Sequence, residues 1–196
     1  MKIVRLNQDT KKDILNTLLK RSPESFGDYE EKVRDIISQV RSKGDKAIFD
    51  YAKSFDGCEL TPDNFKVTPE EIEEGAREAG EELMGILRDS AENIRAYHEL
   101  QKRNSFFTTR DDGSILGQRI TPIKRVGVYV PGGKAAYPSS TLMNIIPARV
   151  AGVEEIAMTT PCGKDGRVDP HTLAAAKVAG VHEIYKTGGA QAIAAL

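Results

Sequence analysis

Hydrophobic side chains recur every three or four positions through much of the first hundred residues. The segments 9–21, 28–42 and 69–102 each place apolar residues on one face at this spacing, which predicts amphipathic helices. A shorter helix is expected at 46–54. The first part of the chain is therefore expected to be rich in helices that cover a core with one face.

The segment 69–102 is expected to form a long helix that follows a short strand at 65–67. Thr68 can cap this helix, Pro69 suits its first position, and Glu71 is the acid that completes a capping box. At the usual rise the helix would be roughly 50 Å long, a length typical of a spine or an arm. Glycines within it predict a bend or a break; they are Gly75, Gly80 and Gly85.

A β-hairpin is predicted at 106–121. Side chains that favour strands flank the turn Asp111-Asp112-Gly113, and Pro122 ends the pattern. Charge then becomes sparse: 44 of the first 120 residues are charged, but only 13 of the last 76. We therefore expect the last part to be buried on both sides, as the strands of parallel sheets are.

After residue 122, short apolar runs alternate with helical patterns. Strands are expected at 126–130, 155–159 and 182–185, and helices at 139–151, 169–179 and 190–196. This order predicts parallel strands with right-handed crossovers. The last helical pattern has no stop signal and no following strand, which indicates an unfinished sheet with an unpaired apolar edge. The expected fold class is α/β, with a helix-rich region and hairpin at 1–122 and an incomplete Rossmann-like parallel βαβαβ sheet at 123–196.

The composition limits the expected partners and compartment. A net charge of -1 gives no long-range attraction to nucleic acid or to an anionic membrane. The N-terminal residues lack the apolar centre of a secretory signal, and no apolar run approaches the length of a transmembrane helix. Cys58 and Cys162 lie far apart without a CxxC motif and are expected to be free thiols. These features favour a cytoplasmic protein without nucleic-acid or membrane partners.

Two glycine turns are the main candidates for ligand binding. They are Pro131-Gly132-Gly133 and Thr187-Gly188-Gly189, each directly after an expected strand. Ligands of open α/β sheets bind at the carboxyl ends of the strands, and glycine lets the backbone approach a phosphate. Glycine also occurs in such turns for purely steric reasons, so both interpretations remain open. We expect the two turns to lie side by side and to shape a cofactor crevice.

Common phosphate-binding and catalytic motifs are absent. A P-loop ending at Lys134 would need glycine where Val128 stands and serine or threonine where Ala135 stands, and no G-x-G-x-x-G string follows a strand. Ser139-Ser140 is expected to cap a helix, because no nucleophile motif surrounds it. The histidines lack metal-ligand spacing; they are His98, His171 and His182. No catalytic residue and no metal ligand is therefore assigned.

Four stretches of the second region resemble one enzyme family. They are RVGVYVPGG at 125–133, YPSSTLMN at 137–144, PARVAGV at 147–153 and TGGAQAIAAL at 187–196. Together these strings closely resemble histidinol dehydrogenase. The match is strong over 123–196, and the helical region before it is compatible in length and pattern. The chain is accordingly identified as the front portion of a member of this family, whose full fold resembles that of aldehyde dehydrogenases.

The resemblance implies an enzyme that oxidises L-histidinol to L-histidine through L-histidinaldehyde, in two NAD-dependent steps of histidine biosynthesis. It also implies zinc and a homodimer of interlocked subunits. Tyr129 and Gln191 match positions that contact NAD in the family; without the resemblance, Tyr129 would be assigned to the core and Gln191 to a helix surface. The family's glutamate–histidine acid/base pair, zinc ligands and most substrate contacts come from sequence beyond Leu196. The 196-residue chain alone is therefore expected to be inactive.

Two other functions remain open from the residues alone. One is a self-contained nucleotide-binding or regulatory α/β module without catalysis. The other is an interaction protein whose helices form an oligomer. The unfinished last helix favours an enzyme portion over the module, and the glycine turns favour it over the interaction protein.

Overall fold

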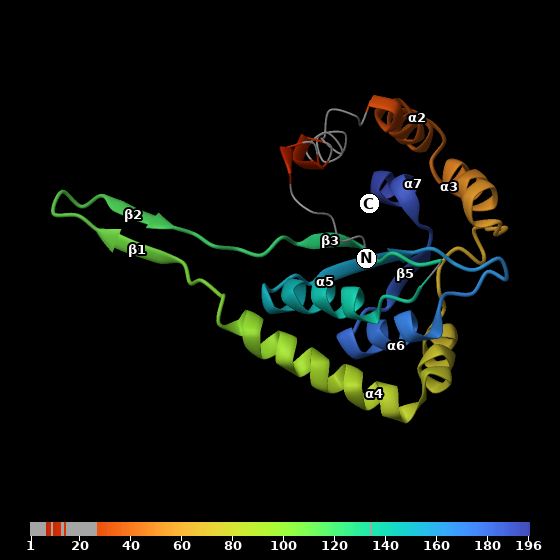
Figure 1. The fold of residues 1–196 in the computed structure, drawn as a ribbon. Coiled ribbons are helices and arrows are strands. Elements are labelled where there is room, and N and C mark those ends of the chain that lie inside the picture. The colour runs from red at the N-terminus through yellow and green to blue at the C-terminus, as the bar shows by residue number, and fades with distance from the viewer. Residues whose placement is uncertain (1–6, 9, 13, 15–26, 134) are drawn as a thin grey trace.

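The chain folds into layers of helices on both sides of a small sheet (Figure 1). This computed structural model describes residues 7–196 except 9, 13, 15–26 and 134. The helix expected at 9–21 falls largely outside the described residues. Within the described part of the chain, no helix is both long and apolar enough to cross a bilayer.

The sheet has three parallel strands in the order β3-β4-β5. Its strands and connecting helices are β3 (Arg125–Tyr129), α5 (Pro138–Val150), β4 (Glu155–Thr160), α6 (Pro170–Ala179) and β5 (Glu183–Lys186). The register pairs Tyr129 with Thr159 and Thr159 with Tyr185, so the strands end nearly level at one edge. The predicted parallel βαβαβ arrangement is confirmed, with strand boundaries within one residue of those expected.

One face of the sheet is apolar and lies against α5 and α6 (Figure 1). Alternate strand residues point to this face, because side chains of a strand alternate between its two sides. Val128, Met158 and Ile184 are examples, and they are 8%, 0% and 0% exposed. The strand residues that alternate with these, including Arg125 and Thr159, point to the opposite and more polar face of the sheet.

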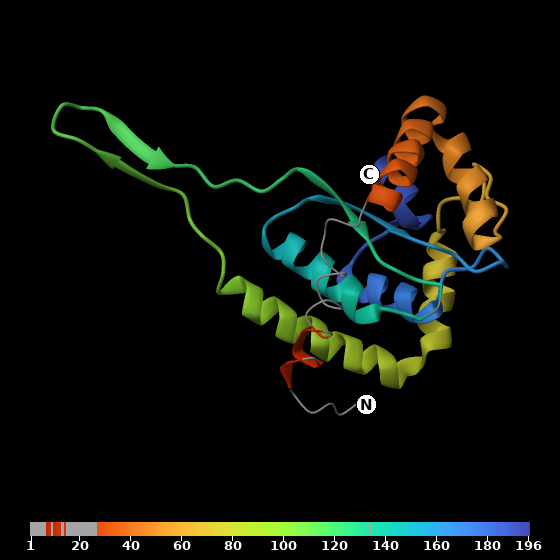
Figure 2. The same cartoon turned by 45° about the horizontal axis from the view of Figure 1, so that its top comes forward.

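The long helix α4 (Pro69–Glu99) lies on the outer side of α5 and α6 (Figure 2). It begins with the expected capping box: the Glu71 N–H donates to the Thr68 hydroxyl, and the Thr68 N–H donates to the Glu71 carboxylate. The expected break occurs at Gly80, where φ is 79° and ψ is 156°. Glycine adopts this conformation without the steric cost that a side chain would add.

The polar face of the sheet is covered in part by three helices. They are α2 (Gly27–Lys43), α3 (Asp45–Tyr51) and α7 (Gly189–Ala195) (Figure 1). The helices expected at 28–42 and 46–54 are thereby confirmed, and the second continues as a π-helical turn, η2 (Ala52–Asp56). α7 packs against α2 and α3, but Leu196 remains 50% exposed.

The expected hairpin is present and projects away from the other elements (Figures 1 and 2). β1 (Phe106–Thr109) pairs antiparallel with β2 (Ile115–Gln118), and Gly113 in the turn has a φ of 83°. Phe106 and Phe107 are 60% and 64% exposed. The hairpin is therefore an arm and contributes little to the core of the chain.

The outer edge of β5 is partly covered by the segment 65–67, which forms the expected short extended stretch. The Val67 N–H donates to the Ile184 carbonyl, and the Lys186 N–H donates to the Phe65 carbonyl, both at 2.9 Å. The expectation of an unpaired sheet edge is thus wrong for β5, since a distant segment of the helical region pairs with it. Residues on both sides of the expected boundary at 122/123 share one core, and the division of the chain there stays a prediction.

Candidate functional site

The two glycine turns meet at one residue at the carboxyl edge of the sheet. Gly132 follows β3, Gly188 follows β5, and Pro161 follows β4 between them. A Cβ added to Gly132 would lie 3.0 Å from Pro161 Cγ, and one added to Gly188 would lie 2.9 Å from Pro161 Cβ. Instead of lying side by side, as the sequence predicts, the turns flank the β4 loop and are joined by Pro161. We call these three residues, together with Tyr129 and Gln191, the turn cluster.

Tyr129 is the last residue of β3 and is partly buried. Its hydroxyl oxygen accepts a hydrogen bond from the Gly189 N–H at 3.4 Å, from the turn that follows β5. The fold thus connects two positions that are 60 residues apart in the chain. Because the phenol acts as an acceptor in this contact, its own O–H can donate to a second partner.

Gln191 lies in the first turn of α7, with 2% of its surface exposed. Its assignment to a helix surface, made from the residues without the family resemblance, is therefore wrong. The packing of α7 against α2 and α3 explains the burial. Among the described residues, the amide oxygen Oε1 has no hydrogen-bond partner. A buried polar atom without a partner is costly, and a ligand that donates a hydrogen bond would remove this cost.

Two threonines that the sequence analysis does not single out lie at the same edge. Thr159, near the end of β4, is 2% exposed, and Thr187, directly after β5, is 1% exposed. Neither hydroxyl has a hydrogen-bond partner within the described part of the chain. The signal that indicates them is a polar side chain at the carboxyl end of an otherwise apolar strand. With Gln191, they make three buried polar groups that could bind a ligand.

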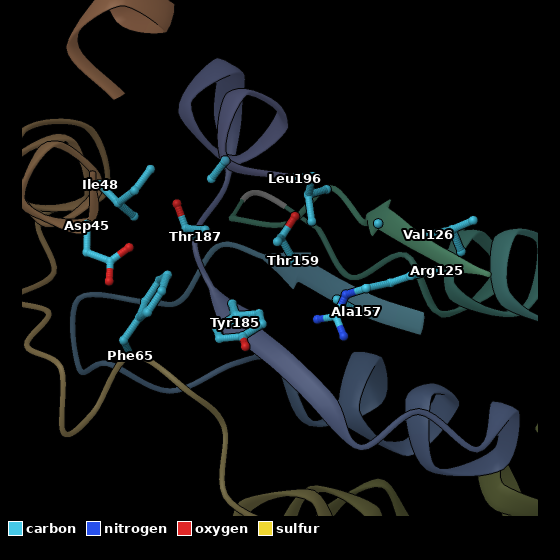
Figure 3. A pocket seen from close by; sticks show the side chains of 12 residues that line it. Asp45, Ile48, Phe65, Arg125, Val126, Ala157, Thr159, Tyr185, Thr187 and Leu196 are labelled. Atoms are coloured by element: carbon cyan, nitrogen blue, oxygen red, sulfur yellow. The ribbon is translucent and has the colours of Figure 1, made fainter. Parts of the chain in front are cut away.

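A cavity of about 450 Å³ opens on the polar face of the sheet (Figure 3). Thr159 and Thr187 line it, and Ile48 and Phe65 supply apolar walls. Tyr129 and Gln191 do not belong to its lining. The cavity therefore adjoins the turn cluster through the two threonines and does not coincide with it.

A group of ion pairs joins the three strands on the same polar face, and two of its members, Arg125 and Tyr185, also line the cavity (Figure 3). The Arg125 guanidinium contacts the carboxylates of Glu155 and Glu183 at 2.7 Å each. The Tyr185 hydroxyl donates to Glu183 at 2.8 Å. This hydrogen bond, together with the Arg125 guanidinium, lowers the pKa of Glu183 from its usual value. Because Arg125 and Glu155 begin their strands, this group ties the amino ends of the sheet together and is best assigned a structural role.

The described residues offer no ready metal centre. No three histidine, cysteine, aspartate or glutamate side chains gather among them as a metal site would require. His98 Nδ1 lies 2.7 Å from the Gln101 amide oxygen. His171 lies 3.6 Å from Asp169, and His182 is exposed before β5. None of these histidines belongs to the turn cluster, which consequently has no group that transfers protons near neutral pH.

Known proteins share both the sequence and the fold of this chain. The family model for histidinol dehydrogenase matches residues 19–196. The histidinol dehydrogenase of Geobacillus kaustophilus is 52% identical over 179 residues, which cover 91% of this chain and 42% of that protein. The one from Halalkalibacterium halodurans is 49% identical over 197 residues, which cover 100% of this chain and 44% of that protein.

A solved structure agrees with these matches. The crystal structure of histidinol dehydrogenase from Elizabethkingia anophelis superposes with a TM-score of 0.79 at 34% identity, covering 85% of this chain and 38% of that one. The chain thus spans less than half the length of the relatives it matches. Since both the family model and relatives near 50% identity cover most of its residues, the chain belongs to the histidinol dehydrogenase family.

Proposed function

We propose that this chain supplies part of the NAD-binding lobe of an oxidoreductase that converts L-histidinol to L-histidine through L-histidinaldehyde. The observation that carries the proposal is the turn cluster, in which Tyr129, Gln191 and two glycine turns converge at the carboxyl edge of a parallel sheet. The names of the relatives support this choice of substrate. When bound, NAD would accept a hydride in each of the two oxidations.

The turn cluster suits a nicotinamide dinucleotide for a steric reason. An added Cβ on Gly132 or Gly188 would crowd Pro161, so packing explains these two glycines. Gly133 instead has open space where a Cβ would lie, so this turn presents backbone without a side chain. Such backbone can come close to a pyrophosphate, which a side chain would keep at a distance. This edge of a parallel α/β sheet is also where ligands generally bind.

The cluster also has polar groups of the right kind. Oε1 of Gln191 can accept a hydrogen bond from a ribose hydroxyl, and the Tyr129 O–H can donate to a phosphate or ribose oxygen. The hydroxyls of Thr159 and Thr187 are buried nearby without partners among the described residues. In this proposal these side chains bind and orient the cofactor, and none of them transfers a proton.

Zinc, which the family resemblance implies, does not fit the described residues of this chain, because no group of three potential ligands occurs among them. The turn cluster also contains no histidine and no carboxylate, so the proton transfers of alcohol oxidation would need other groups. We accordingly expect the 196-residue chain alone to show no turnover with histidinol and NAD. A homodimer and a cytoplasmic location belong to the same proposal.

The test is a calorimetric titration of NAD into the purified protein and its Gln191→Ala and Tyr129→Ala variants. Loss of one or two hydrogen bonds should weaken NAD binding about tenfold in each. Tyr129→Phe removes the same hydroxyl but keeps the ring, so it should weaken NAD binding about as much as Tyr129→Ala.

The matched control is Tyr97→Ala, because Tyr97 is 62% exposed on α4, on the far side of α5 and α6. This variant should bind NAD like the unmodified protein. Equal affinities in all four variants would contradict the assignment of the cofactor to the turn cluster. Turnover of histidinol by the 196-residue chain with NAD and zinc would contradict the expectation that the proton transfers need other groups.

A further inference from the structure

The fold brings two cysteines into contact although they are 104 positions apart. The Cys162 S–H donates to Cys58 Sγ, with the two sulfurs 2.9 Å apart, and both are free thiols. Cys58 lies in the segment after η2, and Cys162 lies in the loop between β4 and α6. They are 1% and 4% exposed and belong to the main hydrophobic core. Nothing in their spacing along the chain indicates this contact.

The backbone of each of the two segments lies close to a side chain of the other. A Cβ on Gly57 would lie 3.5 Å from the side chain of Lys164, and one on Gly166 would lie 3.9 Å from Cys58 Sγ. A disulfide needs the sulfurs about 2.05 Å apart. From the observed separation, the two thiols of Cys58 and Cys162 would therefore have to approach by less than about 1 Å to form one.

We infer that Cys58 and Cys162 form an oxidation site, at which hydrogen peroxide creates a disulfide between the helical region and the β4–α6 loop. Neither thiol belongs to the turn cluster, although Cys162 directly follows Pro161 of that cluster. Because both thiols are buried, peroxide reaches them when the two segments open locally. Both cysteines lie outside regular helices and strands, and such segments open locally more readily than a core strand does.

The hydrogen bond assigns different parts to the two sulfurs. Burial, followed by the neighbouring Cys58, raises the pKa of the Cys162 thiol to about 12. Cys162 therefore keeps its proton at neutral pH and donates it to Cys58. Cys58 accepts this hydrogen bond and does not donate it, so Cys58 is the attacking sulfur in this proposal.

The chemistry takes place in two balanced steps. In the first step the Cys58 sulfur attacks one peroxide oxygen and the O–O bond breaks. The other oxygen leaves as water, taking the proton that Cys58 gives up. Cys58 is then a sulfenic acid. The Cys162 sulfur then attacks Cys58 Sγ, the S–O bond breaks, and the hydroxyl leaves as a second water with the Cys162 proton. Two thiols are oxidised to one disulfide, and one peroxide is reduced to two waters.

The disulfide would fix the loop on which the turn cluster rests. Cys162 directly follows Pro161, against which both glycine turns pack. A bond to Cys58 would close a loop of about a hundred residues and so restrict the unfolded chain. We expect the oxidised protein to unfold roughly 10 °C above the reduced one, and the difference to disappear with dithiothreitol.

The experiment treats the purified protein with hydrogen peroxide, blocks remaining thiols with iodoacetamide, and maps the peptides by mass spectrometry without reduction. The expected product is one linked pair of peptides that contain Cys58 and Cys162, lighter by two hydrogen atoms than the separate peptides. Dithiothreitol should restore both thiols. Free glutathione oxidised in the same solution shows that the peroxide was active.

Two variants test the order of attack. Cys162→Ala should leave Cys58 to form a sulfenic acid that dimedone traps, whereas Cys58→Ala should leave Cys162 reduced under the same treatment. The inference is overturned if peroxide that oxidises glutathione leaves both cysteines alkylated in the unmodified protein, or joins either one preferentially to a cysteine of a second copy of the chain. Peptide mapping of the unmodified protein decides this even if a variant does not fold.

Discussion

Replacing glycine by alanine should have opposite effects on stability at two positions of helix α4. Gly75 and Gly85 both lie within α4, and neither has a positive φ. At Gly75 an added Cβ would lie 2.8 Å from Leu173 Cβ in α6, whereas at Gly85 it would meet no atom within 4 Å. The close approach of α4 to α6 therefore depends on the absence of a side chain at Gly75, whereas a side chain at Gly85 would not affect it.

The expected magnitudes follow from two effects. Alanine in a helix interior is more favourable than glycine by about 1 kcal/mol, a gain that both variants share. At Gly75 the nearest atom is a Cβ, which cannot rotate away without moving α6, so overpacking should cost about 1 to 3 kcal/mol. We expect Gly85→Ala to raise the free energy of unfolding by about 1 kcal/mol, and Gly75→Ala to lower it by up to about 2 kcal/mol.

Urea unfolding followed by circular dichroism measures both free energies, and thermal unfolding gives a second reading of about 2 to 4 °C per kcal/mol. Because the two variants share the same change in helix propensity, their difference isolates the contact between α4 and α6. If Gly75→Ala stabilises the protein as much as Gly85→Ala does, the helices are not packed as closely as described here. The reasoning would then be refuted.

Two further predictions concern local interactions. Asp169 caps α6 by accepting hydrogen bonds from the N–H groups of His171 and Thr172 at 2.9 and 3.2 Å. Asp169→Ala should therefore lower the free energy of unfolding in urea titrations by about 1 kcal/mol. An unchanged free energy would argue against the cap. Glu183 has a lowered pKa because Tyr185 donates to it and Arg125 pairs with it. Its charge should therefore stabilise the fold above its unfolded pKa, and this contribution should fade as the pH falls through the lower, folded value. The test measures the free energy of unfolding of the unmodified protein and of Glu183→Gln from neutral pH to below about pH 4.5, the usual pKa of glutamate. The difference in stability between the two proteins should shrink as the pH falls. A constant difference would contradict the charge interaction.

Local structure was predictable because its causes lie within a few positions of each residue. The capping box at Thr68, the break at Gly80 and the Asp-Gly turn before Ser114 each depend on neighbours along the chain. The alternation of apolar runs and helical patterns after residue 122 likewise predicted parallel strands, since that order leaves few other topologies. The two glycine turns could also be identified as candidates for ligand binding, because each directly follows a predicted strand along the chain.

The site was only partly predictable, because its contacts join residues from different elements. The sequence predicts that the two glycine turns lie side by side. In the structure the strand order β3-β4-β5 separates them, and Pro161, after β4, lies between them. The sequence also contained no sign that Gln191 would be buried, since burial requires α2 and α3 to pack over α7.

By itself, then, the sequence determined where helices, strands and turns begin and end, and which family its strings resemble. The tertiary structure alone decided that Tyr129 reaches Gly189, that 65–67 covers the edge of β5, and that Cys58 touches Cys162. The physical reason is range: propensities, caps and periodicity act between near neighbours, whereas these contacts form only after strand order and helix packing bring distant segments together.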